Sequence, residues 1–211
     1  AIEGQKIGLN LQATQTQAPW LQGENGFSRK GPELTQSSHY ITLPHMQSTG
    51  FVTLDGKKMP IEGRFWMDHE WSSTVLAPEA QGWDWVGLLG DDGSSLVAFQ
   101  IRHKTPGKPP VWTHASLRQA DGRIRNFKNV QFKTLKNWKS NKTGTQYPVS
   151  QSIQLDETTY TLTPLFDEQE LDARMSSGTL YWEGAVRVMS GNRNWGNGYL
   201  EMTGYDRPMS L

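Results

Sequence analysis

Residues 83–102 read WDWVGLLGDDGSSLVAFQIR and have the pattern of a β-hairpin. The pair Asp92-Gly93 separates two apolar segments, and an Asp-Gly pair favours the positive φ angles of the tight turns that join antiparallel strands. Successive side chains of a strand point to opposite faces. Three apolar side chains of the second segment therefore share one face: Val97, Phe99 and Ile101.

The same signals recur along the chain and predict an all-β protein. Asp-Gly pairs also occur at 55–56 and 121–122. No segment has a convincing helical period, and the best candidate for a short helix is 167–175. Short strands at regular spacing are typical of an up-and-down barrel or a sandwich. Strands are expected at 7–11, 38–43, 50–54, 58–66, 83–90, 95–102, 111–118, 123–134, 149–155, 159–164, 180–189 and 198–205.

The composition excludes several classes of protein. The 211 residues favour one domain or slightly more. Lys plus Arg and Asp plus Glu each number 21, and this neutral balance argues against a dedicated nucleic-acid binder. A mean hydropathy of −0.65 and the lack of a long apolar run argue against a transmembrane segment. With no cysteine, disulfides and thiolate chemistry are excluded. Residues 1–8 do not have the pattern of a signal peptide.

Charge is distributed unevenly along the chain. Residues 104–142 contain ten Lys or Arg and a single acid, Asp121, whereas the last third is acidic. The simpler interpretation is a solvated basic hairpin. The alternative is a surface for an anion, a membrane or a nucleic acid, and Trp112 and Trp138 lie within the segment.

The densest cluster of reactive side chains is FWMDHEW at 65–71 with GWDW at 82–85. In extended segments, Asp68 and Glu70 share a face, and Asp84 lies opposite the two indoles that flank it. A carboxyl group between apolar walls loses hydration, which raises its pKa and lets it donate a proton near neutral pH. The candidate catalytic residues are Asp68, His69, Glu70 and Asp84. The candidate aromatic walls are Trp66, Trp71, Trp83 and Trp85.

A structural interpretation of this cluster stays open. Its acids could stabilise turns or pair with Arg64, and its indoles could belong to the core. His69 could act as a base or as a hydrogen-bonded wall residue. A metal site would recruit partners from a set whose spacing matches no standard ligand motif, so we expect no metal and no cofactor. That set is Asp68, Glu70, His103 and His114.

A second group of polar side chains lies near the C-terminus. Tyr181 and Glu183 are two residues apart, as are Tyr199 and Glu201. If the two strands are antiparallel neighbours, these four side chains form one polar patch that could bind a ligand. Arg187 would lie on the same face. The alternative is an internal salt-bridge network that closes the barrel, because buried carboxylates need partners.

These motifs together resemble the carotenoid 1,2-hydratase family. Its superfamily also includes AttH-like proteins, kievitone hydratase and fungal pericyclases of the Diels–Alderase type. The match covers most of the chain because several motifs recur in order. They are GENG at 23–26, SSHY at 37–40, WMDHEW at 66–71, GWDW at 82–85, DDGS at 91–94, YP at 147–148, YWEGA at 181–185 and GYLEMTG at 198–204.

The resemblance implies two lipocalin-like β-barrels in tandem. Residues 56–211 correspond to the second barrel, and residues 1–55 to remnant strands of the first barrel or to an N-terminal extension. The Glu-Trp-Trp-Tyr-type motif of the family's first barrel is absent here. The missing barrel is therefore expected either as a removed segment or as a second chain, with the active site lying between the barrels.

The resemblance further implies an apolar, isoprenoid or polyketide-like ligand. In the hydratases a carboxylic acid protonates a carbon–carbon double bond, and aromatic faces stabilise the developing cation before water adds. Asp68, Asp84 or Glu70 could be that acid, and His69 could orient the acid or the water. The expected location is periplasmic or secreted, with the cytoplasm as the alternative.

Two other functions remain open. The chain could be a non-catalytic, lipocalin-like binding or carrier protein of the bacterial envelope, because a barrel interior is a ligand site without being evidence of catalysis. It could instead act through a partner surface on the basic segment 104–142. In that case, reversing the charges of Lys133, Lys136 and Lys139 would abolish partner binding.

Overall fold

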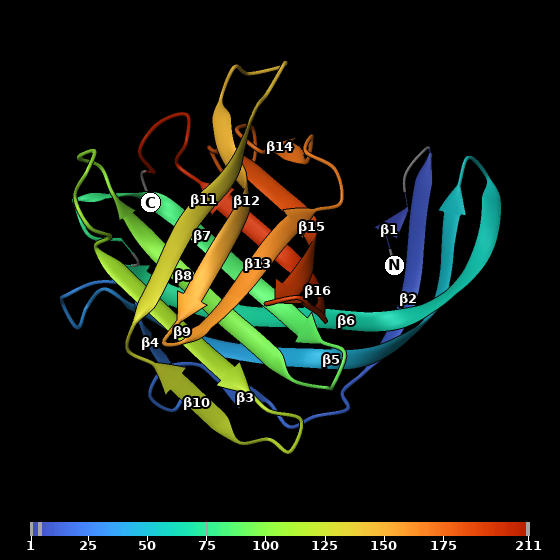
Figure 1. Ribbon diagram of the computed structural model, residues 1–211. Coiled ribbons are helices and arrows are strands. Elements are labelled where there is room, and N and C mark those ends of the chain that lie inside the picture. Colours follow the sequence, from blue (N-terminus) through green and yellow to red (C-terminus); the bar gives the residue numbers. More distant parts are fainter. Residues whose placement is uncertain (1, 4–5, 75, 210–211) are drawn as a thin grey trace.

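Two antiparallel sheets make up the computed structural model, which describes residues 2–3, 6–74 and 76–209 (Figure 1). The predicted all-β class is confirmed. The described ranges contain no helix, and so no helix that could cross a membrane. The helix expected at 167–175 is wrong, because Glu170–Asp172 forms a short strand that pairs with a neighbouring strand and a turn follows it.

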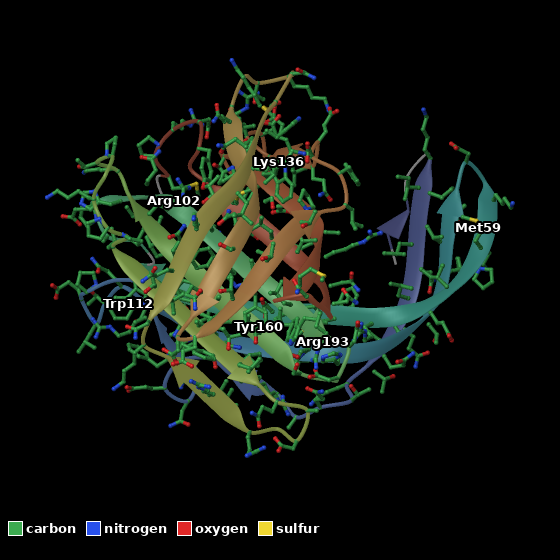
Figure 2. All side chains as sticks on the ribbon, in the orientation of Figure 1. Met59, Arg102, Trp112, Lys136, Tyr160 and Arg193 are labelled. Carbon is green, nitrogen blue, oxygen red and sulfur yellow. The ribbon has the colours of Figure 1, made fainter. Side chains whose placement is uncertain are left out.

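The first sheet is built around one long hairpin. Its strands are β1 (Ile2–Glu3), β2 (Ile7–Thr14), β3 (Trp20–Leu21), β4 (Phe27–Arg29), β5 (Ser37–Leu54) and β6 (Lys57–Thr74). Asp55 and Gly56 join β5 to β6 with φ angles of 47° and 80°, the two positive values that the Asp-Gly pair predicts. The far end of this hairpin, where Met59 lies, curves away from the second sheet (Figure 2).

An irregularity divides the long hairpin into two halves. The register of β5 against β6 shifts between Leu43 and Met46. Pro44 lies within this shift and has no N–H to donate, and His45 has a φ of 52°. One half of the hairpin pairs with β2, and the other half faces the second sheet (Figure 1).

The second sheet is a curled half-barrel. Its order is β10-β9-β8-β7-β16-β15-β13-β12-β11, with β14 beside β15, so its first and last strands in the sequence are neighbours (Figure 1). Its strands are β7 (Ala80–Gly90), β8 (Ser95–His103), β9 (Trp112–Arg118), β10 (Ile124–Phe127), β11 (Val130–Lys139), β12 (Gln146–Leu155), β13 (Thr158–Pro164), β14 (Glu170–Asp172), β15 (Leu180–Ser190) and β16 (Arg193–Thr203).

Side-chain alternation gives β7 and β8 two different faces. The concave face contributes residues such as Val86, Leu88 and Leu96 to the main apolar core. The convex face carries Trp85 and Phe99, which pack in a separate cluster on the side of the first sheet. The second sheet therefore buries one face against itself and part of the other against the first sheet.

The division between the sheets differs from the expected domain boundary at 55/56. Residues 57–74 pair with β5 along their length and so belong to the first sheet. The Asp-Gly turn at 55–56 connects two strands of one hairpin, whereas the chain passes to the second sheet between Thr74 and Ala80. A hairpin signal in a sequence does not reveal which sheet its strands join, because pairing partners can lie far along the chain.

The basic segment 104–142 is partly neutralised by acids from the last third of the chain. Lys136 lies 2.6 Å from Asp167, and Lys142 lies 3.0 Å from Glu168. The side chains of Lys136, Lys142 and Glu168 are exposed, whereas that of Asp167 is half-buried, so these pairs contribute little to stability.

Candidate active site between the two sheets

A cavity of about 360 Å³ lies between the two sheets. The first sheet contributes β5, β6 and the loop after β4, and the second sheet contributes β7, β8 and β16. The cavity therefore combines three carboxyl groups with an aromatic wall. Its lining residues are Lys30, Tyr40, Asp68, Glu70, Trp71, Ser72, Trp83, Trp85, Phe99, Ile101 and Glu201.

Strand register assembles the aromatic wall. Trp83 is the cross-strand partner of Ile101, and Trp85 is the partner of Phe99 on one side and of Glu201 on the other. Directly opposed residues of antiparallel strands point to the same face, so these five side chains share the convex face of the second sheet. The sequence prediction that Trp83 and Trp85 share a face is confirmed.

Glu201 is the most perturbed carboxyl group of the cavity. The Trp83 Nε1–H donates a hydrogen bond of 2.6 Å to Glu201 Oε1. Burial raises the pKa of Glu201 to about 7, the Trp83 bond opposes this rise, and the negative charges of Glu183, Asp68 and Glu70 add to it. At neutral pH this carboxyl group therefore exists in both its acidic and its basic form.

Asp68 is held by a chain of hydrogen bonds from the first sheet. Tyr40 Oη donates to Asp68 Oδ2 at 2.8 Å, and Thr42 Oγ1 donates to Oδ1 at 2.7 Å. Trp85 Nε1 donates to Tyr40 Oη at 3.0 Å, which links this group to the aromatic wall. Desolvation of the carboxyl group raises the pKa of Asp68, although β6 is an exposed strand. The hydrogen bonds from Thr42 and Tyr40 lower this pKa, but their effect is smaller than that of desolvation.

Glu70 forms an ion pair with a residue that sequence reasoning missed. Lys30 Nζ lies 2.7 Å from Glu70 Oε1, and Ser38 Oγ donates a hydrogen bond to the same oxygen. The ammonium group also lies over the rings of Tyr40 and Phe99, 4.7 Å and 4.2 Å from their centroids. Lys30 follows a three-residue strand in a polar segment, and no local pattern distinguishes it from a surface lysine.

Asp84 does not line this cavity. Its side chain lies on the concave face of the second sheet and is almost completely buried. It accepts hydrogen bonds from Gln100 (2.6 Å), Arg102 (3.1 Å) and Tyr205 (2.9 Å). The sequence placed it opposite its flanking indoles, which is confirmed, but it could not show that those indoles, and not Asp84, face the first sheet.

His69 lies on the other face of β6 from Asp68. With Met67 and Trp71 it lines a separate shallow groove. Its ring packs edge-on against Trp71, with 5.0 Å between the centroids. Trp71 lines both this groove and the cavity, whereas His69 is not among the lining residues of the cavity.

The predicted polar patch of β15 and β16 is present only in part at the cavity. Glu183 is the cross-strand partner of Glu201, and Tyr199 Oη donates to Glu183 at 3.2 Å. Tyr181 is paired with Thr203, and neither Tyr181 nor Glu183 contributes to the lining of the cavity.

A second pocket of about 560 Å³ adjoins the cavity. Trp66 and Tyr199 line this second pocket, and Trp85 lines both spaces. Gly87 also lines the pocket, and a Cβ atom there would come within 2.5 Å of the Trp85 ring. Over the described part of the chain, no group of three or more His, Asp or Glu side chains is arranged to hold a metal ion.

The chain matches the AttH-like family over residues 1–205. It belongs to the AttH-like family. A Nitrosomonas europaea protein assigned as an AttH has a crystal structure that superposes with a TM-score of 0.92 at 45% identity, covering 97% of this chain and 63% of that chain. Kievitone hydratase from Nectria haematococca superposes with a TM-score of 0.78 at 16% identity, covering 98% of this chain and 64% of that chain.

The fold of this AttH-like chain extends to more distant proteins. CghA superposes with a TM-score of 0.58 at 14% identity, covering 94% of this chain and 61% of that chain. At 16% and 14% identity the similarity shows the fold alone. The chain spans less than two thirds of the length of each of these three proteins. No curated protein matches the chain.

Replacing Tyr40 of the AttH-like chain by Phe is expected to lower the free energy of unfolding by about 1–3 kcal/mol, because the half-buried Trp85 N–H loses its acceptor and Asp68 loses one of its donors. Tyr40 is 1% exposed and connects Trp85 to Asp68. Urea denaturation measures the change. Tyr199→Phe is the control, since Tyr199 is 40% exposed and should cost much less. Equal losses of unfolding free energy in the two variants would show that the hydrogen bonds of Tyr40 do not stabilise the fold.

The stability of the chain is expected to depend on pH through Glu201. Its pKa is about 7 in the folded chain against an ordinary value of 4.5. Between these values the folded state retains a proton that the unfolded state has released, so the free energy of unfolding falls as pH rises and levels off above about pH 7.

Glu201→Gln removes this ionisation and should flatten that part of the stability curve, with a difference of about 2–4 kcal/mol over the range. Urea denaturation at several pH values measures it. Glu168→Gln is the matched control, because Glu168 is exposed and pairs with Lys142 on the surface. A Glu201→Gln curve as steep as that of the wild type would count against the raised pKa.

Proposed function

We propose that this AttH-like chain carries an acid–base site that adds water to a carbon–carbon double bond of an apolar ligand. The observation that carries the proposal is the Glu201 carboxyl group, whose pKa is about 7 and which faces a cavity walled by Trp83, Trp85 and Phe99. A general acid works best when its pKa lies near the working pH. Asp84 has no part in this site because it lies on the opposite face of β7.

The roles follow from the positions of the groups. Glu201 donates its proton to one carbon of the double bond, and the indole faces of Trp83 and Trp85 stabilise the positive charge that develops on the other carbon. A water oxygen then bonds to that carbon. Asp68, oriented by Tyr40, accepts the proton that the water loses. The two carboxyl groups return to their starting states by proton exchange with solvent.

The similarity to kievitone hydratase supports this proposal at the level of the fold, and the name of that protein states hydration. Fold alone does not determine a reaction, since one fold carries many chemistries. The proposal therefore depends on the acid groups and the aromatic wall of this chain.

The experiment is a titration with prenyl-chain and polyene compounds, followed by intrinsic tryptophan fluorescence. Three of the nine tryptophans line the cavity, so a bound ligand should quench the signal. Compounds that bind are then incubated in deuterated water and examined by mass spectrometry. The expected product gains a hydroxyl group and one carbon-bound deuterium. Saturable binding without any product would overturn the proposed reaction and favour the carrier function.

We also propose that the outer edge of β6 pairs with a strand from the part of the longer relatives that this chain does not cover. Among the described residues, β6 pairs with β5 alone, and no described strand lies along the other edge of its residues 57–71. Unpaired edges with exposed apolar side chains are templates for strand addition. Phe65 and Trp71 are 41% and 49% exposed.

Hydrogen exchange tests this partner. The uncovered part of the Nitrosomonas europaea relative, added as a separate polypeptide, should protect the amides of β6 and co-elute with the chain. The turn at Gly107, far from this edge in the sequence, provides an internal reference that should remain unprotected. Unchanged exchange along β6 would reject the pairing.

A further inference from the structure

We infer that Lys30 binds an oxygen atom of the ligand, so that the cavity takes an apolar compound that carries a hydrogen-bond-accepting oxygen and discriminates against pure hydrocarbons. The inference rests on the proposed function in one respect, that an apolar ligand enters this cavity. It names the class of that ligand and assigns a specificity-determining residue.

Lys30 is a buried cation on the cavity wall. Its side chain is 6% exposed, and its ammonium group lies between Glu70 and the faces of Tyr40 and Phe99. Lys30 is the one basic residue among the described residues that line the cavity. Burial of an ammonium group is costly, and that burial lowers the pKa of Lys30, whereas the Glu70 carboxylate raises it.

The ion pair with Glu70 does not by itself account for this cation. Replacing a buried ion pair by apolar residues of similar volume is often neutral or stabilising, so stability alone does not require a lysine here. The pair instead places a positive charge in an otherwise aromatic part of the wall. A positive charge in an apolar binding site attracts an electronegative atom of the ligand that enters the site.

The ammonium group of Lys30 also has more N–H donors than its protein partner uses. An ammonium group has three N–H donors, and Glu70 is the one hydrogen-bonding partner of Nζ among the residues that the structure describes. The two aromatic rings attract the charge but supply no oxygen acceptor. A ligand oxygen would therefore complete the coordination of a group that water no longer reaches freely.

The other donors on buried and half-buried side chains of the wall are already used, whereas Trp71 and Ser72 are exposed. Tyr40 Oη donates to Asp68, Trp83 Nε1 donates to Glu201, and Trp85 Nε1 donates to Tyr40. Each would have to break a bond within the protein to reach a ligand. Lys30 is thus the buried donor that can hold a ligand oxygen while the hydrogen bonds of both acid groups stay intact.

A matched pair of probes tests the inference. Geranylacetone is a prenyl ketone, and the hydrocarbon in which a methylene group replaces its carbonyl has the same chain length. A hydrogen bond from a charged donor corresponds to a preference of about 10- to 100-fold. The wild type should bind the ketone more tightly by this factor in a tryptophan-fluorescence titration. Lys30→Met should abolish the preference and leave hydrocarbon binding nearly unchanged.

Two further variants protect the test against a folding defect. Lys30→Met leaves Glu70 unpaired, so the double variant Lys30→Met with Glu70→Gln removes both charges together and should also lose the preference. Lys139→Met replaces an exposed lysine of β11 and should retain it. Near-UV circular dichroism checks that each variant is folded.

Several results would overturn the inference: equal binding of the two probes by the wild type, no binding of either probe, or a ketone preference that persists in the double variant. The readout is binding and not turnover, so its failure is distinct from that of the proposed function. A preference that depends on Lys30 with no water addition would reject the hydratase reaction alone. Water addition to both probes at equal affinity would reject the role of Lys30 alone.

Discussion

Asp84→Asn is expected to lower the free energy of unfolding by about 3–5 kcal/mol, the usual cost of removing one partner of a buried ion pair. The Asp84 side chain is 1% exposed and accepts three hydrogen bonds, including one from Arg102. An asparagine has one acceptor oxygen and turns an N–H₂ group toward donors. Arg102, whose side chain is 18% exposed, would lose its counter-ion.

The variant Asp84→Leu with Arg102→Met tests this cause. It removes both charges, and we expect it to be more stable than Asp84→Asn, because no uncompensated charge stays buried. Asp121→Asn is the surface control, since Asp121 and Arg123 form an exposed pair, and it should change stability little. Urea denaturation measures all three. A transition of Asp84→Asn that coincides with the wild type would show that the buried pair does not stabilise the fold.

Glu201→Gln is expected to reduce the rate of water addition by about 10²- to 10⁴-fold, the usual contribution of a general acid. Glutamine keeps the size of the side chain and can still accept the hydrogen bond from Trp83, but it has no acidic proton to give. Ligand binding should therefore survive while turnover is lost. The measurement is product formation with a compound that quenches tryptophan fluorescence.

The pH profile distinguishes loss of an acid from a structural effect. In the wild type the rate should fall as pH rises through about 7, where Glu201 ionises, and the residual rate of Glu201→Gln should lack this step. Glu183→Gln is the matched control, because Glu183 is the cross-strand neighbour of Glu201 but does not line the cavity. A loss in Glu183→Gln as large as in Glu201→Gln would argue against the assigned acid.

Much of the fold was accessible from local patterns. The alternation in 83–102 predicted the hairpin of β7 and β8 and the shared face of Trp83 and Trp85. Of the three Asp-Gly pairs, only 55–56 has positive φ at both residues, whereas at 92–93 and 121–122 the glycine alone has it. The strand expected at 123–134 is divided into β10 and β11 by residues 128–129.

The cavity was accessible only in part. Asp68 and Glu70 were expected to share a face, and both line it. Glu201 was expected to bind ligand, but its raised pKa depends on burial between the sheets and on charges from two other strands, β15 and β6. Lys30 and Tyr40 were not among the candidates, because their positions in the cavity arise from contacts between segments about 30 to 70 residues apart.

The sequence by itself determined most of the strands, the separation of Trp83 and Trp85 from Asp84, and membership of the AttH-like family. These features are local, because the period of two in a strand follows from backbone geometry whatever surrounds it. Tertiary structure alone decided which face of β7 meets the first sheet. Because of that choice, Asp84 lies on the face that forms the buried ion pair with Arg102, whereas Trp83 and Trp85 face the first sheet. The first sheet then supplies Asp68, Glu70 and Lys30 to the cavity from segments that are distant in the sequence.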